Sequence, residues 1–174
     1  ICIGEATDGV FIDYAAASGQ NYDYFARAII DLDEVFTDSA VKTGRLNIRY
    51  NLLANISDLS NIIELKDNID NIPEKSISKS VIGSPVFYAG RKRPIMEMSE
   101  HIESGINLSF FIADMADVQS LDSMVNSGET VLFRDSRGRK IYGVISSFNP
   151  ADVRHGTMVT LIINEVDYSE EVNI

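Results

Sequence analysis

The chain has no tryptophan, one cysteine and two histidines in 174 residues. The single Cys2 excludes an internal disulfide framework and a cysteine-based metal site. His101 and His155 are too few for a histidine-rich metal centre. No apolar run approaches the roughly 18 consecutive residues that a membrane-spanning helix needs. We therefore expect no metal, no cofactor and no membrane span.

Positive charge is also scarce. Lys and Arg number 15 against 26 Asp and Glu, which gives a net charge of −11. This balance argues against a general nucleic-acid binder, because phosphate contacts need clustered Lys and Arg. An apolar content of 45% with 24% charged residues is typical of a folded globular domain. The length suits one ordinary domain with a small segment appended.

The chain begins with Ile1 instead of methionine. The apolar residues 1–3 are too few for a signal peptide and lack its basic flank. We expect a piece of a longer protein; a processed mature chain is the alternative.

The clearest local pattern runs from residue 106 to residue 168. Alternating apolar side chains predict a strand over 106–112. Asp114 as N-cap and Gly128 at the left-handed position after the last turn predict a helix at about 114–127, with an apolar stripe at Val118, Leu121 and Val125. The pattern then predicts strands over 130–134, 140–148 and 157–168, a turn at 135–138 and a polar loop at 149–156.

The first hundred residues give weaker signals. They predict strands over 10–14, 22–29, 46–50, 62–65 and 76–82, a loop or a poorly formed helical turn over 51–61, and a hairpin tip over 67–73. The acidic residues 31–34 lack the ligand spacing of an EF-hand and are predicted to form a solvated connector.

Residues 85–103 hold the densest polar signal. The basic run Arg91, Lys92 and Arg93 could bind a polyanion, but in so acidic a chain it is predicted to be a solvated turn. Four groups that could act in metal or acid–base chemistry follow: Glu97, Glu100, His101 and Glu103. The His-Glu-x-x-His spacing is missing, so a polar strand edge is predicted. A hydrolase using Glu97 and Glu100 as paired carboxylates is the least favoured hypothesis, and we predict no catalytic residue.

Residues 19–28 resemble the late strands of a fibronectin type III repeat. In that pattern a Gly-containing turn precedes a Tyr-x-Tyr-x-x-x-Ala strand, and Tyr22 would be the tyrosine that locks the corner between the sheets. The alternative is an ordinary aromatic strand. The resemblance implies that residues 1–33 are the end of an incomplete repeat, with a connector at 34–39.

Residues 88–168 resemble tail proteins of long-tailed bacteriophages. The resemblance rests on the order of several segments: Tyr-Ala-Gly-Arg-x-x-Pro-Ile at 88–95, Ser-Glu at 99–100, the strand at 106–112, Gly-Glu-Thr-Val-Leu-Phe-Arg-Asp-x-x-Gly-Arg-x-Ile-x-Gly-Val at 128–144, and Glu-Val-Asp-Tyr at 165–168. It implies a mainly β fold with one short α-helix (α+β), in which residues 40–174 form a tail-tube-like β-sandwich or barrel flanked by that helix.

The same resemblance implies a function. The chain would be a structural virion component, a minor tail protein of the tail tip, distal tail or baseplate, made in the bacterial host cytoplasm. It would assemble with copies of itself into a ring (trimer or hexamer) and link other tail proteins, without catalysis. The alternative is a ligand- or carbohydrate-binding module of a secreted or surface protein, supported by seven Tyr and eight Phe. The absence of Trp weighs against sugar stacking.

Two groups of opposite charge could form the contact between copies. The cations flank the predicted 135–138 turn, and the carboxylates lie at the C-terminal end: Arg134, Arg137, Arg139 and Lys140 against Glu165, Asp167, Glu170 and Glu171. Opposite charges on separate elements can set the register of a subunit contact. The alternative is that both groups are solvated ends of one monomer, where each pair stabilises little.

Overall fold

The computed structural model describes residues 1–29, 36–65 and 75–170. The predicted connector at 31–34, the predicted hairpin tip at 67–73 and Glu171 lie outside the described residues. Within them the chain is mainly β with a single helix, so the predicted fold class is confirmed.

One antiparallel sheet of seven strands forms the body, in the order β6-β5-β9-β10-β11-β8-β7. Its strands are β5 (Asn51–Asn55), β6 (Asp58–Leu65), β7 (Lys75–Val86), β8 (Ile95–Ile112), β9 (Val131–Arg134), β10 (Lys140–Val153) and β11 (Gly156–Glu165). Two small ribbons lie beside the body: β1 (Asn21–Tyr24) pairs with β4 (Lys42–Arg45), and β2 (Arg27–Ile29) pairs with β3 (Phe36–Asp38).

The helix α1 (Met115–Ser127) confirms the prediction at 114–127. The Asp114 carboxylate accepts a hydrogen bond from the Ala116 N–H at 2.9 Å, as an N-cap does. Gly128 ends the helix at φ 65°, a left-handed conformation that costs glycine little. The buried stripe is Val118, Leu121 and Met124, with Met124 in the place predicted for Val125.

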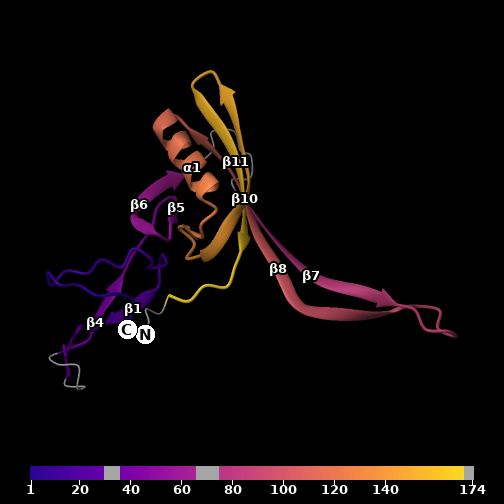
Figure 1. Ribbon diagram of the computed structural model, residues 1–174, viewed down its shortest axis with the longest axis horizontal. Helices are drawn as coiled ribbons and strands as arrows, with labels where there is room; N and C mark the ends of the chain where they lie inside the picture. Colours follow the sequence, from indigo (N-terminus) through magenta and orange to yellow (C-terminus); the bar gives the residue numbers. More distant parts are fainter. Residues whose placement is uncertain (30–35, 66–74, 171–174) are drawn as a thin grey trace.

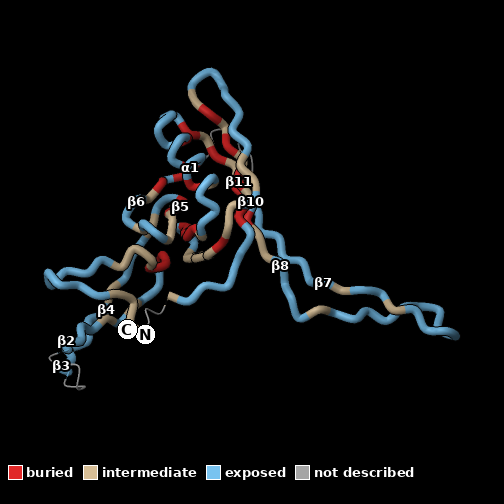
Figure 2. The backbone as a smooth tube through the Cα atoms, viewed as in Figure 1, coloured by how far each residue is buried: buried red, intermediate tan, exposed pale blue. Residues whose placement is uncertain are grey.

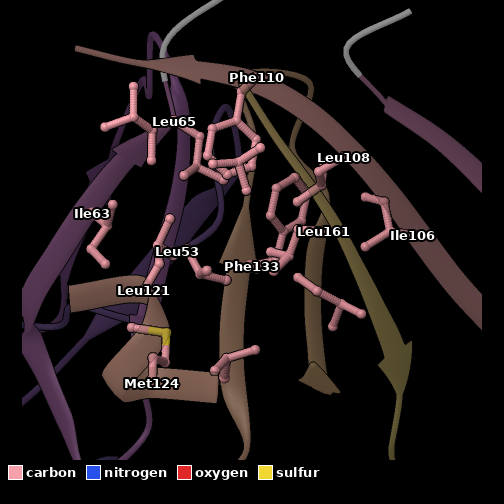
Figure 3. Packing of buried hydrophobic residues seen from close by; sticks show 14 of the residues in the cluster. Leu53, Ile63, Leu65, Ile106, Leu108, Phe110, Leu121, Met124, Phe133 and Leu161 are labelled. Carbon is pink, nitrogen blue, oxygen red and sulfur yellow. The ribbon is translucent and has the colours of Figure 1, made fainter. Parts of the chain in front are cut away.

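The core lies between the concave side of the sheet and α1 (Figure 3). The inner part of β8 alternates as predicted for 106–112, and β11 alternates as well. Each strand turns every second side chain inward: Ile106, Leu108, Phe110 and Ile112 from β8, and Thr157, Val159, Leu161 and Ile163 from β11. The first strand of the sheet, β6, approaches β8 across this core. Side-chain packing, and not hydrogen bonding between the edge strands β6 and β7, therefore closes the body.

Two predictions between residues 46 and 61 are wrong. Residues 46–50 form no strand, because their backbone groups pair with the N-terminal segment: the Gly19 N–H donates to the Leu46 carbonyl oxygen, and the Ile48 N–H donates to Ser18 Oγ. The predicted loop at 51–61 is instead the β5–β6 hairpin. The hairpin contains many polar residues, so the sequence did not indicate β5. This strand lies in the sheet interior, is mostly buried and shows no clean alternation.

Three further boundaries differ from the predictions. Residues 149–156 are not a loop, since β10 continues to Val153 and pairs with β11 up to Gly156. The last strand ends at Glu165 instead of at residue 168. Residues 10–14 form no strand, and 22–29 divide into β1 and β2. These segments are largely exposed, so burial imposes no apolar alternation by which their ends could be recognised.

A long hairpin of β7 and β8, here called the arm, projects from the body (Figure 1). Its register runs from Lys75 opposite Leu108 to Val86 opposite Ile95. Val81 pairs with Ile102, but Gly83 pairs with Met98, so β8 advances four residues where β7 advances two. This β-bulge lies on β8, and bulges of this kind bend a ribbon.

Two tyrosine hydroxyl groups of β1 bind the N-terminal segment that precedes this strand. The Tyr22 hydroxyl accepts a hydrogen bond from the Ala17 N–H at 3.0 Å, and Ala16 and Ala17 are buried. The Tyr24 hydroxyl donates to the Asp13 carboxylate at 2.8 Å; burial, and then this bond, raise the pKa of Tyr24 to about 12. The fibronectin-like assignment and the boundaries at 33 and 40 stay predictions.

Gly143 is a position where the sheet requires glycine. An alanine Cβ there would lie 2.5 Å from the Asn164 carbonyl oxygen, a backbone atom that cannot move independently. We expect Gly143→Ala to lower the free energy of unfolding by about 1–3 kcal/mol, measured by urea titration. The control is Gly44→Ala in β4, where the nearest atom is the Tyr24 Cε2 at 3.4 Å and the change should stay within about 0.5 kcal/mol. Equal losses in the two variants would contradict this account.

Candidate assembly surfaces

Arg134, predicted as an interface residue, is only 2% exposed. Its Nη1 donates to the Ala16 carbonyl oxygen at 3.1 Å, which fixes the N-terminal segment to β9. Burial lowers the pKa of the Arg134 guanidinium, and the nearby Asp13 opposes that shift. Its contact lies inside the chain, which disfavours an intermolecular role.

Asp135, predicted only as part of a turn, is the centre of a buried polar cluster. Its side chain is fully buried, and Oδ2 accepts from Lys75 Nζ at 2.5 Å. Oδ1 accepts from the N–H groups of Arg137 and Arg139, each at 2.9 Å. Lys75 Nζ also donates to Asn51 Oδ1 at 3.1 Å. Because Lys75 begins β7, this cluster joins the base of the arm to β5 and to the β9–β10 turn.

The electrostatics of Asp135 follow from these contacts. Burial by itself would raise the pKa of this carboxyl. The hydrogen bonds from Lys75 and from the backbone of Arg139 and Arg137 outweigh burial and hold its pKa below the ordinary value. The carboxylate is therefore charged and fully paired at neutral pH.

The remaining predicted cations differ in what they contact. Arg139 Nη1 lies 3.6 Å from Asp135 Oδ2, and Lys140 Nζ lies 2.5 Å from Glu170 Oε1. Arg137 is exposed and makes no ion pair within the described ranges. Lys140 and Glu170, one from each predicted charge group, thus meet within a single chain, and the predicted contact between copies stays a prediction. The structure places no predicted cation against Glu165 or Asp167 among the described residues.

The acidic C-terminal segment, residues 165–168, is held along β10. The Val166 N–H donates to the Tyr142 carbonyl oxygen at 2.9 Å. The Tyr168 ring stacks on the Tyr142 ring with centroids 4.5 Å apart. Burial, and then a hydrogen bond with Glu170, raise the pKa of Tyr142. Glu165 and Asp167 are exposed, so the segment presents two carboxylates on a fixed backbone.

The arm has one apolar face. Side chains of directly opposed residues share a face, and alternate residues of a strand return to it. The register therefore groups Ile77, Val81 and Pro85 of β7 with Met96, Met98 and Ile102 of β8, and one polar pair, Lys79 opposite Ser104, lies on the same face. A Cβ added at Gly83 would meet Met98 Sδ at 2.9 Å and Met96 Cε at 3.2 Å, which places both thioethers on this face. Lys79 and Ser104 separate the outer apolar residues of this face from the buried Ile106 at its base.

This apolar face is uncovered. Met98 is 59% exposed and Ile102 is 63% exposed, and Figure 2 shows the arm exposed along most of its length. The total accessible surface is 12326 Å², whereas a compact monomer of this length exposes roughly 8,500 Å². The chain therefore exposes more surface than a compact monomer of its length.

The arm tip, residues 87–93, combines aromatic and cationic side chains. Phe87 is 77% exposed and Tyr88 is 51% exposed. The Arg91 N–H donates to the Tyr88 carbonyl oxygen at 3.2 Å and forms the turn. Arg91, Lys92 and Arg93 are all exposed, and none makes an ion pair in the described part of the chain. The sequence predicts a solvated turn at this basic run, but it does not indicate that the turn lies at the end of an arm.

Other classes of site find no support among the described residues. They contain no group of His, Cys, Asp and Glu arranged to hold a metal ion. Glu97 and Glu100 are exposed side chains of the arm. The helix α1 is too short to cross a membrane, and no other helix is described.

Comparison with known proteins gives only distant likenesses. No family model matches the chain, and no curated protein matches it. Among solved structures, it is similar to a chain from the tail of an empty gene transfer agent particle with C6 symmetry, at a TM-score of 0.47 and 10% identity over 68% of this chain and 92% of that one. It is also similar to a chain of the native gene transfer agent virion, at a TM-score of 0.46 and 12% identity over 68% and 92%. At TM-scores below 0.5 these likenesses assign no family.

Proposed function

We propose that this chain is a structural component of a bacteriophage tail, at the tail tip or distal tail. It assembles with copies of itself into a ring, a trimer or hexamer, and links other tail proteins without catalysis. The observation that carries the proposal is the arm, a ribbon that projects from the body with an uncovered and largely apolar face. The ordered resemblance of residues 88–168 to phage tail proteins supplies the biological context.

The arm is a ribbon of two strands that extends beyond the body. A two-stranded hairpin is at best marginally stable in water, and burial of apolar surface contributes about 25 cal/mol per Å². Covering the side chains of Val81, Met98 and Ile102 on a neighbouring copy would stabilise both the arm and the assembly. Methionines suit such a contact because their flexible side chains adapt to the partner's shape.

The sheet edges favour assembly as well. β7 is the last strand of the sheet, and its outer backbone groups can pair with another chain. An arm that projects from one side and packs on a different part of the next copy makes a head-to-tail contact. Such contacts close into rings when the rotation between copies allows it.

We expect an arm-shortened variant to test this function. Val81 and Ile102 are direct partners, so residues 82–101 can be replaced by Asn-Gly, which forms a two-residue hairpin turn. The wild-type chain should form rings in electron microscopy and show a multimeric mass in light scattering. The variant should remain a monomer with the same thermal unfolding of the body.

The matched control keeps the arm and changes its other face. Ser78→Ala and Ser80→Ala lie on the polar side of β7 and should leave assembly unchanged. A wild-type chain that stays strictly monomeric, with no rings, would contradict the proposed function. Normal assembly of the arm-shortened variant would show that the arm takes no part in the proposed assembly.

A further inference from the structure

We infer that the arm tip of one copy binds the acidic C-terminal segment of a second copy, with Arg91, Lys92 and Arg93 against Glu165 and Asp167. This inference rests on the proposed self-assembly and names the surface that receives the arm. It replaces the sequence-based pairing, in which the cations flanking the 135–138 turn met these carboxylates.

The tip is the strongest unpaired cationic feature that the structure describes. Three consecutive cations project at the end of the arm in a chain of net charge −11. By contrast, Arg134 contacts Ala16, Arg139 lies by Asp135 and Lys140 pairs with Glu170. The cations around the turn are therefore largely engaged within the chain, whereas those of the tip are not.

The acidic C-terminal segment matches the tip in both charge and apolar character. Its two exposed carboxylates alternate with Val166 and Tyr168, which are 36% and 45% exposed. The tip offers guanidinium and ammonium groups beside Phe87 and Tyr88. Guanidinium–carboxylate pairs can form two parallel hydrogen bonds, and the neighbouring aromatic side chains would exclude water from them. The contacts to Tyr142 hold the segment in place before binding, which lowers the entropic cost.

The geometry requires a second copy. In Figure 1 the arm and the C-terminal segment leave the body in different directions. The two strands of the arm are paired from its base to Val86 and Ile95, and this paired ribbon holds the tip away from its own body. Along β8 the arm extends roughly 35 Å from residue 106 to residue 95 at about 3.3 Å per residue. That reach is close to the diameter of a small domain.

Two other acceptors fit less well. The exposed carboxylates of α1 include Asp122, but Asp122 already accepts from Asn126 Nδ2 at 3.1 Å. A nucleic acid would supply phosphates, yet three cations in a chain of net charge −11 give a weak and strongly salt-dependent contact. The segment at 165–168 combines free charge with apolar surface, and we therefore assign the tip to it.

Charge reversal tests the contact. The tip-reversed variant carries Arg91→Glu, Lys92→Glu and Arg93→Glu; the segment-reversed variant carries Glu165→Lys and Asp167→Lys. Each alone should self-associate roughly tenfold more weakly or worse in sedimentation velocity. A 1:1 mixture of the two should associate, because each tip then meets a segment of opposite sign. One chain carrying all five changes should also recover, and rising salt should weaken the wild-type association.

The control variant separates a local contact from overall charge. Lys42→Glu, Arg49→Glu and Arg154→Glu reverse three exposed cations away from the tip and give the same net charge, −11 − 6 = −17. This variant should associate like the wild type. An equal loss in the control, no rescue in the mixture, or wild-type association of the tip-reversed variant would each overturn the inference. So would a tip-reversed variant that assembles normally but no longer binds a short DNA duplex. Ring formation by the wild-type chain still decides the proposed function, because that result does not depend on which surface the arm tip contacts.

Discussion

Replacing Asp135 by alanine is expected to lower the free energy of unfolding by about 3–5 kcal/mol, because it leaves the largely buried Lys75 ammonium without its carboxylate. The change also removes the acceptor for the N–H groups of Arg137 and Arg139, so the β9–β10 turn loses two hydrogen bonds. Urea unfolding at neutral pH measures the loss. Since Lys75 is the first residue of β7, the base of the arm should loosen and self-association should weaken as well.

The pH dependence of stability gives a second measurement of the same group. The pKa of Asp135 is held below its ordinary value in the folded chain, so the carboxylate stabilises the fold above that ordinary value. The stabilisation is lost as the pH falls through the lower, folded-state pKa. Wild-type stability should therefore include an acid-sensitive component below about pH 4 that is missing in Asp135→Asn.

Two variants serve as controls for Asp135. Asp117→Asn removes an exposed carboxylate from the first turn of α1 and should cost less than about 1 kcal/mol. The double variant Lys75→Met with Asp135→Asn removes both charges and should recover part of the loss, because an apolar side chain can replace a buried ion without an unpaired charge. A loss in Asp135→Ala no larger than in Asp117→Asn would show that the buried cluster does not hold the arm base.

Local signals explain what the sequence could predict. The bounds of α1 follow from Asp114 and Gly128, two residues whose preferences act within one helical turn. Strands β8 and β11 were predicted where they line the core, because burial of one face imposes alternation. Outside the core this constraint disappears. The length of the arm and the 149–156 hairpin are defined by pairing register instead, and single-sequence patterns carry little of that information.

The candidate surfaces were harder to predict for a related reason. The partner of Asp135 is Lys75, 60 residues earlier, and the partner of Arg134 is Ala16, 118 residues earlier. A list of charges along the chain cannot show which of them the fold will bury or pair. The basic run at 91–93 was visible in the sequence, but its exposure followed only from its place at the end of the arm.

Phe133→Ala is expected to be about as damaging as the loss of Asp135, at about 3–5 kcal/mol. Phe133 is fully buried in β9, between Leu53 of β5 and Ile141 of β10 in the sheet register. Truncation would leave a cavity at the centre of the core, where the strands on both sides limit collapse (Figure 3). Urea unfolding measures the effect, and association should fall only as far as the folded fraction falls.

Phe87→Ala is expected to have the opposite effects to Phe133→Ala: it should weaken association and leave stability nearly unchanged. Phe87 is 77% exposed at the arm tip, so its truncation should change the free energy of unfolding by no more than about 0.5 kcal/mol. Its association should nevertheless weaken, because the proposed contact covers this ring. Truncation of a phenylalanine to alanine should thus lower stability when the ring lies in the core, and weaken assembly when the ring lies at the arm tip. If Phe87→Ala destabilised the fold as much as Phe133→Ala, the arm would belong to the folded core; if it left association unchanged, the aromatic part of the tip would lie outside the contact.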